Sequence, residues 1–134
     1  MTWIVMFLIA FVVFIAVDLV WLGFVARTFY KDQLGDLMAK KVNWTAAMIF
    51  YVLYVVGLTV IVIHPAASEG SVLNAFLFGG FVSFLMYATY DLTNLATLEN
   101  WPLKMTVVDL IWGASLGALT SGITTWLVLL IGVL

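Results

Sequence analysis

The sequence predicts an all-α membrane protein, a bundle of four transmembrane helices. Of its 134 residues, 66% are hydrophobic and 9% are charged. Such a chain lacks the polar surface that would cover a water-soluble core, so much of its surface must face lipid. Four apolar segments long enough to cross a bilayer lie at about residues 3–24, 45–63, 72–95 and 102–133. No linker or change in composition separates them, and we therefore expect one membrane domain over residues 1–134.

The first apolar segment runs from Trp3 to Phe24. Its length of about 22 residues, at about 1.5 Å per residue, is enough to cross a hydrocarbon core of roughly 30 Å. A secretory signal peptide would need a basic start, a shorter apolar stretch and a small-residue cleavage site. The chain starts without a charged side chain and the segment ends in bulky residues, so we expect a membrane helix interrupted only by Asp18.

The connection from Val25 to Trp44 holds four of the five basic residues. Its larger side chains recur at helical spacing among charged ones, which suggests a short amphipathic helix at the membrane interface. An ordinary polar connection explains the pattern equally well. Tyr30, in this segment, falls where aromatic residues anchor a chain at the membrane interface.

Proline residues mark two of the remaining helix boundaries. The second helix is predicted to end at His64-Pro65, because proline disfavours helical geometry at the residue before it. A short turn over residues 66–70 leads into the third helix, which starts at Val72. The fourth begins near Pro102, since proline is compatible with the first turn of a helix.

The basic residues predict the orientation of the bundle. The first connection holds four of them, the third holds Lys104, and the termini and second connection hold none. With four crossings, all five lie on one side of the membrane. The positive-inside rule makes that side the cytoplasm, so both termini are expected on the outer, periplasmic side.

Three acidic residues lie inside the apolar segments: Asp18, Asp91 and Asp109. The predicted orientation puts all three in the cytoplasmic half of the membrane. An Asp at the centre of a membrane helix costs roughly 2.5 to 3.5 kcal/mol, so it needs a partner or local water. We expect these carboxyl groups to face the interior of the bundle.

Polar and aromatic residues accompany these acids at helical spacing. Tyr87, Asp91 and Asn94 share one face of the third helix, and Tyr90 flanks it. Asp18 shares a face with Trp21, three residues on, and Asp109 shares a face with Trp112 in the same way. An inverted repeat would explain this recurring acid-to-tryptophan spacing, and chance explains it nearly as well.

The fourth helix carries Gly113, Gly117 and Ser121 at four-residue intervals. Stripes of small residues let helix backbones approach closely, and Gly79, Gly80 and Ser83 offer a matching surface on the third helix. We interpret the stripe as packing within the bundle. The same stripe would serve equally well as a homodimer interface.

Several function classes are excluded by what the sequence lacks. The net charge is −2 and there is no basic patch, so we expect no nucleic-acid partner. Without cysteine there is no disulfide, thiolate metal site or cysteine nucleophile. The single histidine, His64, falls at the membrane face opposite the three intramembrane acids. The spacing of these acids does not require a metal ion. No phosphate-binding loop occurs. The sequence therefore predicts no metal site and leaves any cofactor unknown.

The stretch from Tyr87 to Thr97, with Trp101-Pro102 and the segment Val108 to Gly113, resembles a bacterial family of small predicted integral membrane proteins, domain of unknown function family 2177. The segment Asp18 to Gly23 fits that family's opening helix, so the resemblance spans essentially the whole chain. It implies a multi-pass protein of the bacterial inner membrane, and some relatives lie near genes of fatty-acyl modification. No activity is established for the family, and it supplies no catalytic residue.

Three functional hypotheses fit these observations. The first is an enzyme or accessory factor that acts on a lipid or fatty-acyl substrate by acid–base chemistry, with membrane lipids as its partners. Asp18, Asp91 and Asp109 would be its catalytic, proton-handling residues. The second is a small proton-coupled transporter, and the third is a structural scaffold without chemistry. In the first hypothesis the substrate-binding residues would be Tyr87, Tyr90, Asn94, Trp21 and Trp112.

Overall fold

The protein is a bundle of four long helices in the computed structural model. The structure describes the backbone of residues 1–134 and every side chain except those of Val25 and Arg27. Four helical spans are long and apolar enough to cross a membrane: Thr2–Phe24, Trp44–Glu69, Val72–Thr97 and Leu103–Ile131. No strand occurs in residues 1–134. The predicted all-α, four-helix fold is therefore confirmed.

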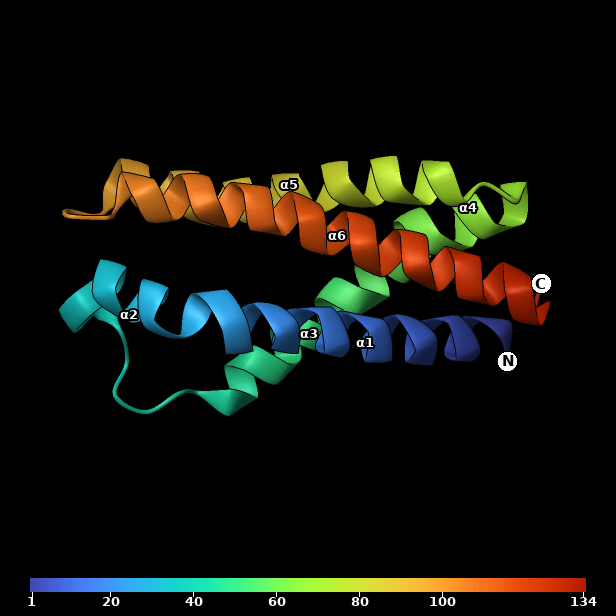
Figure 1. The fold of residues 1–134 in the computed structure, drawn as a ribbon, viewed down its shortest axis with the longest axis horizontal. Coiled ribbons are helices and arrows are strands. Elements are labelled where there is room, and N and C mark those ends of the chain that lie inside the picture. The colour runs from blue at the N-terminus through green and yellow to red at the C-terminus, as the bar shows by residue number, and fades with distance from the viewer.

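The first span continues into the basic connection. Helix α1 (Thr2–Trp21) passes through a π-helical turn, η1 (Leu22–Ala26), into α2 (Arg27–Leu34). Figure 1 shows α2 extending in the direction of α1. Helix α2 ends where Gly35 adopts a φ of 53°, a conformation that glycine tolerates, and a short 3₁₀ turn, η2 (Gly35–Leu37), follows. The amphipathic segment is thus helical in part, while its place at a membrane interface stays a prediction.

The second span differs from the prediction at its end. Helix α3 (Trp44–Leu58) begins at Asn43, whose side chain accepts a hydrogen bond from the Ala46 amide at 3.1 Å. It continues through a π-helical turn, η3 (Thr59–Ile63), into α4 (His64–Glu69), so the predicted end at His64-Pro65 is wrong. In an α-helix the proline ring would clash with the carbonyl group four residues earlier. The π-helical turn is wider and changes the position of that carbonyl group relative to the ring. Pro65 then lies in the first turn of α4, where its missing N–H is not needed.

The last two spans form an antiparallel pair. Helix α5 (Val72–Thr97) begins at Ser71, whose hydroxyl accepts from the Asn74 amide at 3.1 Å. Helix α6 (Leu103–Ile131) begins after Pro102. Figure 1 shows α5 and α6 running together along the long axis, and it shows both chain termini at the same end of the bundle. The connections that hold the basic residues lie at the other end.

Small residues bring α5 and α6 close together. A Cβ added to Gly117 would lie 2.2 Å from the Ser83 Cβ and 2.3 Å from the Gly79 carbonyl oxygen, far inside normal contact. Gly113, Gly117 and Ser121 are buried. The small-residue stripe therefore packs inside the monomer, and a homodimer through it would require α5 and α6 to separate.

Large side chains fill the space on the other side of the bundle. Phe14 of α1 is 2% exposed, and its ring lies 5.3 Å from that of Tyr54 on α3. Leu58 and Leu116 join the same buried cluster. The Tyr54 and Ser83 hydroxyls are 2.6 Å apart, and this hydrogen bond ties α3 to α5.

Candidate functional site

Two of the three intramembrane acids are neighbours. Asp91 on α5 and Asp109 on α6 both lie about two turns from the connection between these helices, so antiparallel packing brings them to one level. Their carboxyl groups are close enough to interact electrostatically. Asp91 is fully buried, and no described side chain supplies a donor to either of its oxygens. Buried polar atoms without a hydrogen-bond partner are uncommon in folded proteins, which makes this carboxyl pair the candidate centre of the site.

Tyr30 is a site residue that sequence reasoning missed, because it was interpreted as an interface anchor. It lies on α2, and its hydroxyl donates a hydrogen bond to the Asp109 carboxylate. Burial, and then this hydrogen bond, raise the pKa of Tyr30 well above its usual value of 10.0, so the phenol stays a donor. Helical spacing placed Tyr30 on the apolar face of its segment. Nothing in the sequence identified the partner of that face.

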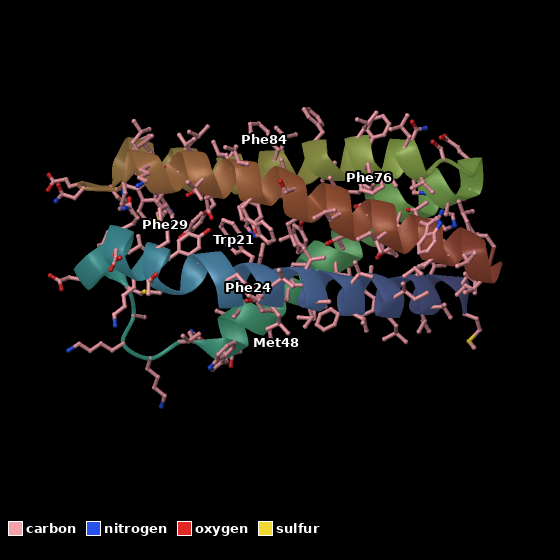
Figure 2. All side chains as sticks on the ribbon, in the orientation of Figure 1. Trp21, Phe24, Phe29, Met48, Phe76 and Phe84 are labelled. Atoms are coloured by element: carbon pink, nitrogen blue, oxygen red, sulfur yellow. The ribbon has the colours of Figure 1, made fainter. Side chains whose placement is uncertain are left out.

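The two segments with the acid-to-tryptophan spacing meet in the structure. Trp21 on α1 and Trp112 on α6 stack with ring centroids 4.4 Å apart and planes inclined by 6°. Figure 2 shows Trp21 in the space between α1 and α6. Because the helices run in opposite directions, Asp18 and Asp109 lie on opposite sides of the stacked pair along the bundle axis.

A small cavity lies beside this stack. It is open on one side and has a volume of about 160 Å³, and Asp18, Tyr51 and Asp109 contribute to its wall. Its remaining wall is apolar and aromatic, and consists of Phe14, Trp21, Leu22, Tyr30, Tyr87 and Trp112. Every described residue in this lining is therefore acidic, aromatic or aliphatic. We call this space the aromatic cavity.

A second, larger cavity opens between α3 and the α5–α6 pair. It is partly open and has a volume of about 420 Å³, and its wall is almost entirely apolar, formed by Phe50, Met86, Tyr87, Tyr90 and Asp109. We call this space the apolar cavity. Tyr87 and Asp109 line both cavities, so the two spaces are adjacent at these residues.

The remaining predicted site residues are less central. Tyr90 is 56% exposed and lies at the apolar cavity, with its ring 5.7 Å from that of Trp101. Asn94 is half-buried one turn beyond Asp91 and is absent from the described lining of both cavities. The structure thus gathers most of the predicted residues around Asp109, and it leaves Asn94 outside.

Residues at the opposite end of the bundle are separate from this site. His64 stacks on Trp3, with ring centroids 3.9 Å apart. Among the described residues, no three His, Cys, Asp or Glu side chains are grouped closely enough to hold a metal ion.

The fold and its buried polar residues define a multi-pass α-helical membrane protein. More narrowly, the chain belongs to the family described as Predicted membrane protein (DUF2177), whose family model matches residues 3–126. The resemblance noted in the sequence is therefore confirmed. No curated protein and no solved structure matches the chain.

Proposed function

We propose that this protein takes a lipid or fatty-acyl chain from the membrane into the apolar cavity and handles a proton at Asp109. The supporting observation is the cavity itself, which has an apolar wall and a carboxyl group at one point of it. Its volume of about 420 Å³ lies within the range of roughly 300–1,000 Å³ that is usual for small-molecule sites.

The carboxyl pair would perform the acid–base step. A proton would pass to a bound substrate, or be withdrawn from it, at Asp109, because this residue reaches the cavity wall. Tyr30 would hold the Asp109 carboxylate in position through its hydrogen bond. Asp18 would act as the third acid, from the far side of the Trp21–Trp112 stack.

The other candidate residues would position the substrate. Tyr87 and Tyr90 line the apolar cavity, and Trp21 with Trp112 would close the site toward α1. Asn94 would act from the adjoining turn of α5. In this proposal the protein acts in the bacterial inner membrane, with its site in the cytoplasmic half.

The proposal is tested by comparing membrane lipids, by mass spectrometry, from cells that express the wild type or the Asp91→Asn, Asp109→Asn double variant at matched levels. A lipid or fatty-acyl species that changes with the wild type alone is expected. Asp36→Asn, which removes an exposed carboxylate from the first connection, is the matched control and should behave as wild type. Identical lipid profiles for a well-inserted wild type and double variant would contradict the proposal.

The proposed orientation has its own test in this cysteine-free chain. A cysteine introduced by Ser68→Cys should react with an impermeant thiol reagent added outside intact cells. One introduced by Asp36→Cys should react only after the cells are opened. The reverse pattern would place the carboxyl pair in the outer half of the membrane.

Proton-coupled transport is the second candidate, and buried hydroxyl groups favour it. The side-chain oxygens of four α6 residues are buried without a hydrogen-bond partner among the described residues: Thr120, Ser121, Thr124 and Thr125. Such groups hold internal water when there is room for it. Water along this part of α6 would extend a proton route from Asp109 toward the end that holds the termini. Unchanged lipids together with proton flux in liposomes would select this function.

A further inference from the structure

We propose that the aromatic cavity binds an alkylammonium group, so that the substrate is an amphiphile with a positively charged head and an apolar chain. This inference rests on the proposed function, because it assigns the chain to the apolar cavity. It adds to the proposed function the charge of the ligand and the class of its head group, which an apolar wall cannot specify.

The wall of the aromatic cavity has the chemistry that recognises an ammonium ion. Trp21 and Trp112 contribute indole rings, and Tyr51 and Tyr87 contribute phenol rings. Aromatic faces attract cations through the ring quadrupole, most strongly for tryptophan, and sets of aromatic rings are a known means of binding quaternary ammonium ligands. Here two carboxyl groups join the rings.

The charge of the site favours a cation over other head groups. Asp18 and Asp109 line the cavity, and no described lining residue carries a positive charge. Lys104 lies near this end of the bundle, but its ammonium group is placed over the Phe29 ring, 6.0 Å from the ring centroid. A carboxylate inside a membrane protein is costly without a counter-charge. An anionic head group would add repulsion, and an uncharged one would leave that cost in place.

The sizes of the two cavities and their adjacency favour an amphiphile. The aromatic cavity, at about 160 Å³, is suited to a compact head, whereas the apolar cavity offers about 420 Å³. Tyr87 and Asp109 line both spaces, so in this proposal a molecule with its chain in the apolar cavity would place its head on the other side of these two residues, beside the Trp21–Trp112 stack.

The first experiment uses the purified full chain in dodecyl maltoside micelles. Binding of labelled dodecyltrimethylammonium is measured by equilibrium dialysis against protein-free micelles, and dodecanol serves as the uncharged ligand of equal chain length. We expect the ammonium ligand to bind on the order of tenfold more tightly than dodecanol, the increment that a cation–π site supplies. Equal binding of the two would overturn the inference and leave the apolar-chain proposal standing. Binding of neither would count against both.

Two pairs of variants locate the effect. Asp18→Asn should weaken ammonium binding on the order of tenfold, and Trp112→Leu on the order of fivefold, while dodecanol binding changes little. The matched controls are Glu69→Gln and Trp126→Leu, which alter an acid and a tryptophan that lie in neither the aromatic nor the apolar cavity. If Asp18→Asn does not accumulate in the membrane, Trp112→Leu decides the location. Equal losses in the controls would overturn the assignment to the aromatic cavity.

A competition experiment separates the two sources of an ammonium head group. The protein is placed in nanodiscs of phosphatidylglycerol, or of phosphatidylglycerol mixed with phosphatidylethanolamine, and the labelled ligand is titrated into each. Weaker apparent binding in the mixed nanodiscs would identify a phospholipid head group as the occupant. Equal binding would identify a free alkylammonium amphiphile.

Discussion

The two halves of the bundle pack in opposite ways. The α5–α6 pair is held by backbone proximity, with Gly117 against Gly79 and Ser83. The half formed by α1 and α3 is held by rings, such as those of Phe14 and Tyr54. Small residues let helices approach until no gap is left, whereas rigid rings that meet at tilted angles leave spaces between them.

This difference explains where the site lies. The close α5–α6 pair fixes Asp91 and Asp109 relative to each other. Both cavities lie between this pair and the aromatic half, and each is lined by residues from both. The packing thus combines a fixed carboxyl pair with space for a ligand beside it. The following three substitutions test the contrast.

The largest effect is expected from Gly117→Ala. The new methyl group would collide with the Ser83 side chain and the Gly79 backbone, and backbone cannot yield without separating the helices. Overpacking of this kind lowers the free energy of unfolding by roughly 1–3 kcal/mol. The measurement is reversible unfolding in mixed micelles with increasing SDS, followed by circular dichroism.

The control for this change is Gly57→Ala on α3. An added Cβ there would meet only the end of the Met86 side chain, at an ordinary contact distance of 3.7 Å. We expect Gly57→Ala to be neutral or stabilising, since alanine favours helix by about 1 kcal/mol over glycine. Equal destabilisation by the two changes would remove the distinction between the halves.

An intermediate effect is expected from Tyr54→Phe, which deletes the hydrogen bond that joins the halves. Ser83 is fully buried, so its hydroxyl would lose its partner on α3. The cost should be about 1 kcal/mol in the same unfolding assay. Adding Ser83→Ala should then cost little more, because it removes the orphaned hydroxyl. Fully additive losses would show that the two hydroxyls do not depend on each other.

The smallest effect is expected from Phe11→Leu in the aromatic half. Phe11 is only partly buried, and its ring lies 5.8 Å from that of Phe7 and 6.5 Å from that of Phe14. The lost ring contacts should cost roughly 0.5–1 kcal/mol, and neighbouring side chains can adjust. A loss as large as that of Gly117→Ala would mean that the aromatic half is packed as tightly as the glycine interface.

Sequence patterns located much of the fold and part of the site. Hydropathy found all four spans, and the three acids were recognised by their cost in a membrane. The end of the second span was misplaced, because the proline rule applies to an α-helix and η3 is a π-helical turn. The contact of Tyr30 with Asp109 was missed, because the two residues are far apart in sequence.

The sequence by itself determined that this is a four-helix membrane protein with carboxyl groups inside its bundle. Those properties depend on length, hydropathy and local spacing, which can be read from each segment without knowing how it packs against the others. Only the tertiary structure decided that Asp91 and Asp109 are neighbours, that Trp21 stacks on Trp112, and that Tyr87 and Asp109 line two adjacent cavities. These properties depend on the rotation and separation of packed helices. Helical periodicity gives the face on which a residue lies, but not the helix that the face meets.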